Sequence, residues 1–138
     1  MTEGAVRKRV LLPAEVVARF DAAQARLRTV GVTGTNGKST TTSMVAAIVE
    51  AAGEPWARLT TLGGCVNGVD LGSRKRSVGE FLATVERAVA AGVRTLALEY
   101  TSKSLLEGAA QRWRPHVSVF TNLTRDHLDR KSTRLNSS

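Results

Sequence analysis

The stretch from Gly31 to Thr40 reads GVTGTNGKST, and it joins two segments of different character. Residues 29–33 are rich in the β-branched side chains that are typical of a strand. Residues 40–52 repeat apolar side chains at the spacing of a helix. The apolar positions of this helix are expected to be Met44, Val45, Ile48 and Val49. A strand, a glycine-rich turn and a helix in this order begin a parallel α/β unit.

The rest of the chain continues this alternation between strand and helix patterns. The spacing of apolar residues predicts helices over 13–27, 40–52, 78–91 and 101–113, and strands over 29–33, 56–62, 93–100 and 116–122. The dipeptide Asn67-Gly68, in a glycine-rich segment, is typical of a hairpin turn or a short excursion. The sequence therefore predicts an α/β fold, a P-loop-type parallel sheet flanked by helices.

The composition indicates one globular domain without an internal disulfide. The chain has 138 residues, of which 42% are hydrophobic and 23% are charged, and this is ordinary for a protein with a packed core. Cys65 is the one cysteine, and we interpret it as a small, partly buried apolar residue. No apolar stretch approaches the roughly 18 residues of a membrane helix. We therefore expect a soluble, cytoplasmic protein that does not contact a membrane.

The net charge of +8 raises the possibility of nucleic-acid binding. Much of the excess positive charge lies near the two ends of the chain, and no aromatic residues alternate with it to form a stacking surface. We therefore interpret the charge as a solvated basic surface and expect no nucleic-acid partner. The sequence does not predict an oligomeric state.

The glycine-rich turn has the groups that bind a phosphate chain. Glycines let backbone N–H groups approach an anion, and the start of a helix favours negative charge. Lys38 can neutralise the β- and γ-phosphates, and the Ser39 hydroxyl can ligate a bridging Mg²⁺. The common motif would place its first glycine at position 32, where Val32 stands, so this loop is a shorter form. The alternative is an ordinary turn with a solvated lysine. The expected ATP-binding residues are Gly34, Thr35, Asn36, Gly37, Lys38, Ser39 and Thr40.

Polar residues also follow two later strands. Glu99 comes after the apolar run 93–98, and His127 lies between two acids in the segment 121–129. In open parallel sheets ligands gather beyond the carboxyl ends of the strands, where Ser39 is also expected. Glu99 could hold a metal ion directly or through water, and His127 could ligate a second one. The alternatives are a solvated carboxylate at a strand end and an inert loop histidine.

Three segments together resemble the Mur ligase family. They read GVTGTNGKST at 31–40, LEYTS at 98–102 and FTNLTRDHLD at 120–129, in the order and at the spacing of that family. The likeness is greatest to the branch that adds the third residue of the peptidoglycan stem peptide. The resemblance implies a partial ATP-binding central domain at 29–129. The helical spacing before it makes 1–28 a helical lead-in, and 130–138 is expected to be a polar tail unlike the family.

The resemblance implies an ATP-dependent acid–amino-acid ligase, which forms an amide bond. In that family ATP converts a substrate carboxylate to an acyl phosphate, and an amine then displaces the phosphate. The catalytic residues would be Lys38, Glu99 and His127. Lys38 would hold the phosphates, Ser39 and Glu99 would hold one Mg²⁺, and His127 would help to hold a second. The implied partners are ATP and a small pair of carboxylate and amine substrates.

The chain departs from the family pattern in several places. Too few residues precede the phosphate loop for the UDP-binding domain of the stem-peptide enzymes. The family's Ser-Ser-His after the glutamate is replaced by Thr101-Ser102-Lys103, and its Thr-Thr-Pro is not found near residues 75–77. The family continues to a carbamylated lysine and a C-terminal domain that binds the amino acid. We therefore expect a fragment with little turnover of its own, and a UDP-sugar-peptide substrate does not follow.

Two other classes of protein stay open from the sequence. A simple P-loop NTPase or kinase would use Glu99 as a metal ligand and would release ADP without an amine acceptor. A non-catalytic nucleotide-binding module would bind ATP tightly without hydrolysis.

Overall fold

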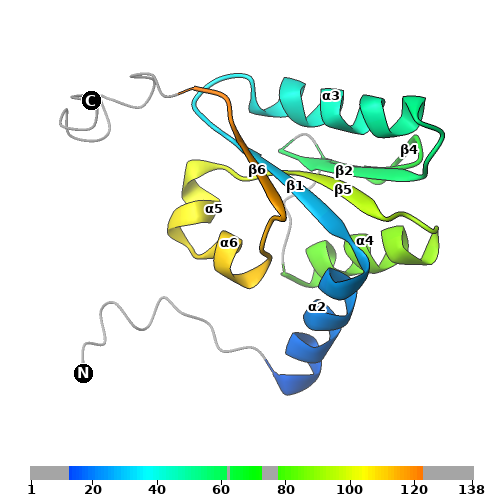
Figure 1. Ribbon diagram of the computed structural model, residues 1–138. Helices are drawn as coiled ribbons and strands as arrows, with labels where there is room; N and C mark the ends of the chain where they lie inside the picture. Colours follow the sequence, from blue (N-terminus) through cyan, green and yellow to red (C-terminus); the bar gives the residue numbers. More distant parts are fainter. Residues whose placement is uncertain (1–12, 62, 73–77, 123–138) are drawn as a thin grey trace.

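A computed structural model of the chain describes residues 13–61, 63–72 and 78–122. The strands are β1 (Arg28–Thr33), β2 (Trp56–Thr60), β3 (Gly63–Val66), β4 (Val69–Asp70), β5 (Thr95–Glu99) and β6 (Val117–Phe120). The helices are α2 (Ala14–Arg26), α3 (Lys38–Ala51), α4 (Val78–Ala90), α5 (Ser102–Leu106) and α6 (Ala109–Arg112). The strands form one sheet in the order β4-β3-β2-β5-β1-β6 (Figure 1). The predicted α/β fold, a sheet flanked by helices, is confirmed.

The sheet is parallel over four strands and antiparallel at one edge. Strands β2, β5, β1 and β6 pair in parallel, whereas β3 pairs antiparallel with β2 and β4 antiparallel with β3. The predicted turn joins β3 to β4, with φ of 49° at Asn67 and 88° at Gly68, as a two-residue hairpin turn needs. The expectation of a purely parallel sheet is wrong at this edge, because so short a turn can join only antiparallel neighbours.

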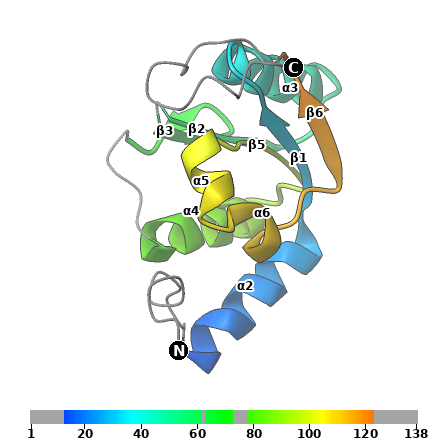
Figure 2. The same ribbon diagram turned by 90° about the vertical axis from the view of Figure 1, so that its left-hand side faces the viewer.

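The two faces of the sheet are covered by different helices. Helix α3 lies on one face, and α2 and α4 lie on the other (Figures 1 and 2). Successive residues of a strand point to opposite faces, so Leu96 and Leu98 of β5 join the cluster under α2 and α4, and Ala97 joins the cluster under α3. The cluster under α3 consists of Ala46, Trp56, Cys65 and Ala97. The core therefore consists of a larger cluster under α2 and α4 and a smaller cluster under α3.

The inward face of α3 differs from the prediction. Met44 and Ile48 are 58% and 68% exposed, and the buried residues of the helix are Thr42 and Ala46. The phosphate loop fixes where α3 begins, and that start decides which side chains face the sheet. The spacing of apolar residues therefore predicted the helix correctly but misplaced two of its four inner positions, because small residues occupy the close contact with Ala97.

The helix predicted over 101–113 is two short helices, and the prediction of one element is wrong. Gly108, between α5 and α6, has φ of 85°, a left-handed conformation that ends an α-helix. The turn redirects the chain, so that Trp113, directly after α6, is only 2% exposed. The break thus lets a large aromatic side chain enter the core.

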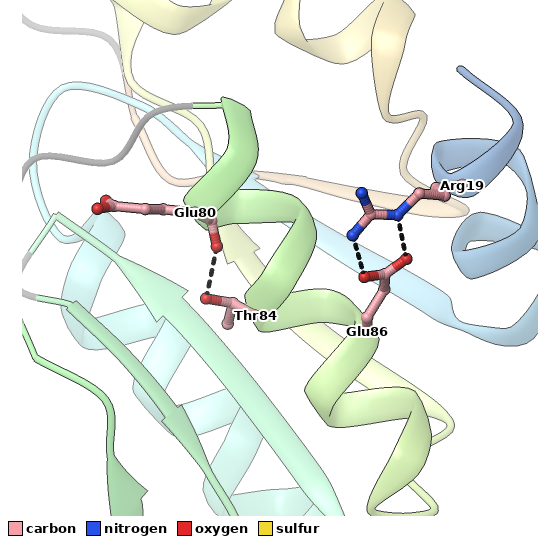
Figure 3. A network of polar contacts seen from close by, with 4 residues as sticks. All are labelled: Arg19, Glu80, Thr84 and Glu86. Carbon is pink, nitrogen blue, oxygen red and sulfur yellow. Dashed lines mark hydrogen bonds and ion pairs between the residues drawn. The ribbon is translucent and has the colours of Figure 1, made fainter. Parts of the chain in front are cut away.

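Helices α2 and α4 are joined by apolar and charged contacts. The ring centroids of Phe20 and Phe81 lie 6.0 Å apart, and Trp113 packs edge-on against both. The guanidinium of Arg19 donates two hydrogen bonds to the Glu86 carboxylate, at 2.6 and 2.9 Å (Figure 3). The hydrogen bond from Arg19 lowers the pKa of Glu86, and the same bond raises the pKa of Arg19. Helix α2 is therefore attached to α4 by both kinds of contact.

Within residues 13–61, 63–72 and 78–122, no helix is both long and apolar enough to cross a bilayer. The cytoplasmic location expected from the sequence stays a prediction.

Candidate phosphate-binding site

The carboxyl ends of the four parallel strands meet at one edge of the sheet. In the strand register Val32 is opposite Glu99, Thr33 is opposite Phe120, and Leu59 is opposite Leu98. The residues that follow these strands therefore lie at one level. They are the loop 34–37 after β1, Thr61 after β2, Glu99 at the end of β5, and Thr121 with Asn122 after β6. This is the edge at which open parallel sheets bind ligands.

The loop after β1 exposes the start of α3. Gly34 and Gly37 have φ of 140° and 83°, conformations that favour glycine. The first N–H groups of a helix have no partner within it, and those of residues 38–40 donate to no acceptor in the part of the chain that the structure describes. The Lys38 ammonium donates to the carbonyls of Gly34 at 2.9 Å and Thr35 at 3.2 Å. Amide donors and a cation thus gather at one point, as phosphate binding requires.

Ser39 and Glu99 lie side by side, as predicted from their places after β1 and at the end of β5. The Ser39 hydroxyl donates to Oε1 of Glu99 at 2.8 Å. The backbone N–H of Thr61 donates to the same oxygen at 3.1 Å, a contact that the sequence did not predict. The Ser39 hydroxyl and the Thr61 N–H thus bond to the same oxygen, Oε1, and Oε2 of Glu99 has no partner among the described residues. These two bonds fix the orientation of the carboxylate.

These residues line a cavity of about 500 Å³. Its lining residues are Thr35, Asn36, Gly37, Lys38, Ser39, Thr40, Thr61, Glu99, Thr101, Ser102 and Lys103. Six of the seven predicted ATP-binding residues are among them, and the seventh, Gly34, packs against Thr121. Two lysines and one carboxylate give the lining an excess of positive charge. Lys103, at the place where the sequence departs from the Mur ligase pattern, thus faces the same cavity as Lys38.

The sequence missed the residues that hold the tip of the loop. Thr121 and Asn122 were noted only as part of a motif, yet both bond to Asn36. Their signal was their place directly after a parallel strand, the same argument that predicted Glu99 near Ser39. The predicted metal ligand His127 lies outside the described residues.

The oxygen atoms present fit Mg²⁺, and the amides fit a triphosphate. Mg²⁺ prefers oxygen ligands and is often held by one or two protein groups together with substrate phosphates. The Ser39 hydroxyl and the Glu99 carboxylate supply two oxygens 2.8 Å apart, beside the N–H groups that begin α3. Within the described ranges, this edge included, no three His, Cys, Asp or Glu side chains gather to hold a metal ion, so a Mg²⁺ here would need ligands from the substrate phosphates as well. Ser39 and Glu99 are therefore the residues that would hold the ion.

A second hollow, of about 440 Å³, lies away from this edge. It is lined by Asp21, Gln24, Ala25, Arg114, Pro115 and His116, and the last three precede the amino end of β6. Gln24 already bonds to the backbone of Arg112 and Arg114, and Nδ1 of His116 accepts from Thr29 N–H. The bonds of Gln24 join α2 to the end of α6, and the bond of His116 joins β1 to the residues before β6, so these polar groups hold the fold together.

The sequence pattern of one known family matches most of the chain. The Mur ligase middle domain matches residues 32–136. The chain belongs to the Mur ligase family. The matched range includes the phosphate loop, Glu99 and the segment with His127, and it runs beyond Asp129, the expected end of the domain, into residues that the structure does not describe.

Individual Mur ligases show how much of a whole enzyme the chain represents. A UDP-N-acetylmuramoyl-L-alanyl-D-glutamate--2,6-diaminopimelate ligase of Geobacter sulfurreducens is 42% identical over 108 residues, which are 72% of this chain and 20% of the relative. The ligase of that name from Pseudomonas syringae is 39% identical over 124 residues, 86% of this chain and 25% of the relative. The chain thus spans about a fifth to a quarter of the length of these curated relatives.

A solved structure confirms the fold of this part of the family. A structure of a UDP-N-acetylmuramoyl-L-alanyl-D-glutamate--2,6-diaminopimelate ligase superposes with a TM-score of 0.72 at 22% sequence identity. The superposition covers 90% of this chain and 28% of that chain. The arrangement of strands and helices is therefore that of a Mur ligase.

Proposed function

We propose that this chain is the Mg-ATP-binding part of a ligase that joins an acid to an amine. The observation that carries the proposal is the contact between Ser39 and Glu99, 2.8 Å long, beside Lys38 and the N–H groups that begin α3. Lys38 would leave the loop carbonyls and contact the β- and γ-phosphates, and Ser39 with Glu99 would hold Mg²⁺. His127 is proposed as a ligand of a second Mg²⁺ from the family resemblance alone.

The reaction proposed is the activation of a substrate carboxylate as an acyl phosphate, followed by attack of an amine. Cations beside the phosphates offset the repulsion between a carboxylate and a triphosphate, and they stabilise the charge that develops during transfer. The curated relatives are named as ligases of a diaminopimelate substrate, which supports a role in peptidoglycan biosynthesis. Lys103, at the place where the sequence departs from the Mur ligase pattern, lines the same cavity as Lys38.

The ATP site is tested by calorimetry on the whole 138-residue chain with Mg-ATP. The Lys38→Ala variant should bind ATP about tenfold to a hundredfold more weakly, because a charge-assisted contact to the phosphates is lost. Arg94→Ala removes one exposed positive charge at the amino end of β5 and should leave the affinity unchanged. Equal affinity in wild type and Lys38→Ala would contradict the proposal.

Turnover distinguishes the ligase from the other two classes. The chain spans about a fifth to a quarter of its curated relatives, so we expect ATP binding with little ADP release, with or without an added acid and amine. Full-rate ADP release without an amine would instead indicate a simple NTPase. Restoration of amine-dependent product by the remaining part of a related ligase, added as a separate chain, would support the ligase over a non-catalytic module.

A further inference from the structure

The tip of the phosphate loop is attached to the residues that follow β6. The Thr121 hydroxyl donates to the Asn36 carbonyl at 2.7 Å. In the opposite direction, the Asn36 N–H donates to Oδ1 of Asn122 at 3.2 Å, and the Thr35 N–H donates to the Asn122 carbonyl at 2.9 Å. The two partners are 85 or 86 residues apart in the chain, so these bonds join separate strand ends.

The phosphate loop and the residues after β6 are also packed closely against each other at Gly34. A Cβ atom at Gly34 would lie 1.9 Å from the Thr121 hydroxyl oxygen and 3.0 Å from the backbone nitrogen of Asn122. Only a glycine fits at that distance. The loop is therefore held from its first residue to its third against Thr121 and Asn122.

We propose that Thr121 and Asn122 are positioning residues that shape the phosphate loop for its nucleotide. Neither is among the residues that line the cavity, so both would act through Asn36 and Thr35 rather than by touching the ligand. The amides of Thr35 and Asn36 are directed to Asn122, which leaves the amides of residues 38–40 to converge on the phosphate. A loop fixed before binding loses less conformational entropy when the ligand arrives.

The inference rests on the proposed ATP function and is tested first by ligand affinity. Thr121→Val keeps the shape of the side chain and removes the hydroxyl, and it should weaken ATP binding about fivefold, the effect of one hydrogen bond. Thr121→Ser keeps the hydroxyl and should stay within about twofold of wild type. Inorganic tripolyphosphate, which has no base or sugar, should show the same loss as ATP in Thr121→Val. Equal ATP affinity in the valine variant, the serine variant and wild type would overturn the inference.

A second measurement needs no ligand and separates the two proposals. Amide hydrogen exchange at Thr35 and Asn36 should be slow in wild type and in Thr121→Ser, and several times faster in Thr121→Val. Asn122 is exposed, so Asn122→Ala should fold, and it should speed exchange at Asn36 because that amide loses its acceptor. If wild type fails to bind ATP, the proposed function is wrong, while exchange still decides whether Thr121 and Asn122 hold the loop. Unchanged exchange in both Thr121→Val and Asn122→Ala would overturn the inference by itself.

Discussion

Two glycines of the phosphate loop have positive φ, but only one is also confined by its surroundings. Gly34, with φ of 140°, lies against Thr121. For Gly37, with φ of 83°, no heavy atom of the described residues, its chain neighbours aside, lies within 4 Å of the place where a Cβ would stand. A substitution by alanine therefore tests backbone conformation alone at Gly37, and backbone conformation together with packing at Gly34.

Gly34→Ala should lower the free energy of unfolding by about 2–4 kcal/mol, since backbone strain and a steric overlap add. Gly37→Ala should cost about 1 kcal/mol, the conformational term alone. Urea denaturation followed by tryptophan fluorescence measures both. If the two variants lose equal stability, the close contact between Gly34 and Thr121 is not present in solution.

The sequence predicted that the candidate residues with polar side chains would lie at one edge of the sheet. Lys38, Ser39 and Glu99 were found because a lysine, a hydroxyl and a carboxylate follow strands, and parallel strands bring their carboxyl ends together. The role of Thr61 could not be found, because its backbone N–H makes the contact and any residue except proline supplies one. Thr121 and Asn122 also follow a parallel strand, but their contacts with the loop depend on the register of β6 against β1, which residue spacing does not give.

Among the elements, the four parallel strands and the three long helices were predicted, and the two short helices α5 and α6 were not. Helix α4 occupies the range that apolar spacing predicted, and its buried residues Leu82, Val85 and Ala88 recur at that spacing. The break between α5 and α6 was missed, because the position of Gly108 in a run of good helix formers did not reveal that Trp113 must turn into the core. Tertiary packing decided the conformation there, and local spacing did not.

The attachment of α2 to α4 is predicted to depend on pH through Glu86. Its pKa is lowered by the hydrogen bond from Arg19, so the stabilisation is complete above the usual pKa of a glutamate and is lost as the pH falls through the lowered value. Both side chains are exposed, 53% for Arg19 and 38% for Glu86, so the effect should be small and screened by salt.

Thermal unfolding between pH 7 and pH 3 should show this dependence. Wild type should lose more stability over that range than Glu86→Gln, and 1 M NaCl should reduce the difference. Glu54→Gln is a suitable control, because Glu54 is exposed and has no ion pair among the described residues. Identical pH profiles for wild type and Glu86→Gln would mean that the pair seen in Figure 3 contributes nothing in solution.

At the scale of the whole molecule, a network of buried hydrogen bonds and aromatic contacts connects the sheet to helices α2 and α4. The Tyr100 hydroxyl donates to the Trp113 carbonyl at 2.5 Å, and the Trp113 indole donates to the Thr29 hydroxyl at 2.8 Å. Trp113 also contacts Phe20 and Phe81, from α2 and α4. Tyr100 directly follows Glu99, so the position of the candidate metal ligand depends on this network.

Burial raises the pKa of Tyr100 well above its usual range, and the side chain is only 4% exposed. An unfolded chain releases the phenol proton from about pH 10 upward, whereas the folded chain retains it. The free energy of unfolding should therefore fall as the pH rises above about 10, by at most about 1.4 kcal/mol per pH unit from this group. Because Tyr100 is the one tyrosine of the sequence, tyrosinate absorbance should appear together with unfolding.

The variant Tyr100→Phe separates this titration from that of the lysines. It lacks the phenol proton and should lose stability less steeply between pH 9 and pH 11. At pH 7 it should be less stable than wild type by about 1 kcal/mol, since the Trp113 carbonyl loses its donor. Urea denaturation at each pH gives the two slopes. Tyrosinate absorbance near pH 10 in a chain that is still folded would show that Tyr100 is open to solvent, and the link between the buried network and Glu99 would then fail.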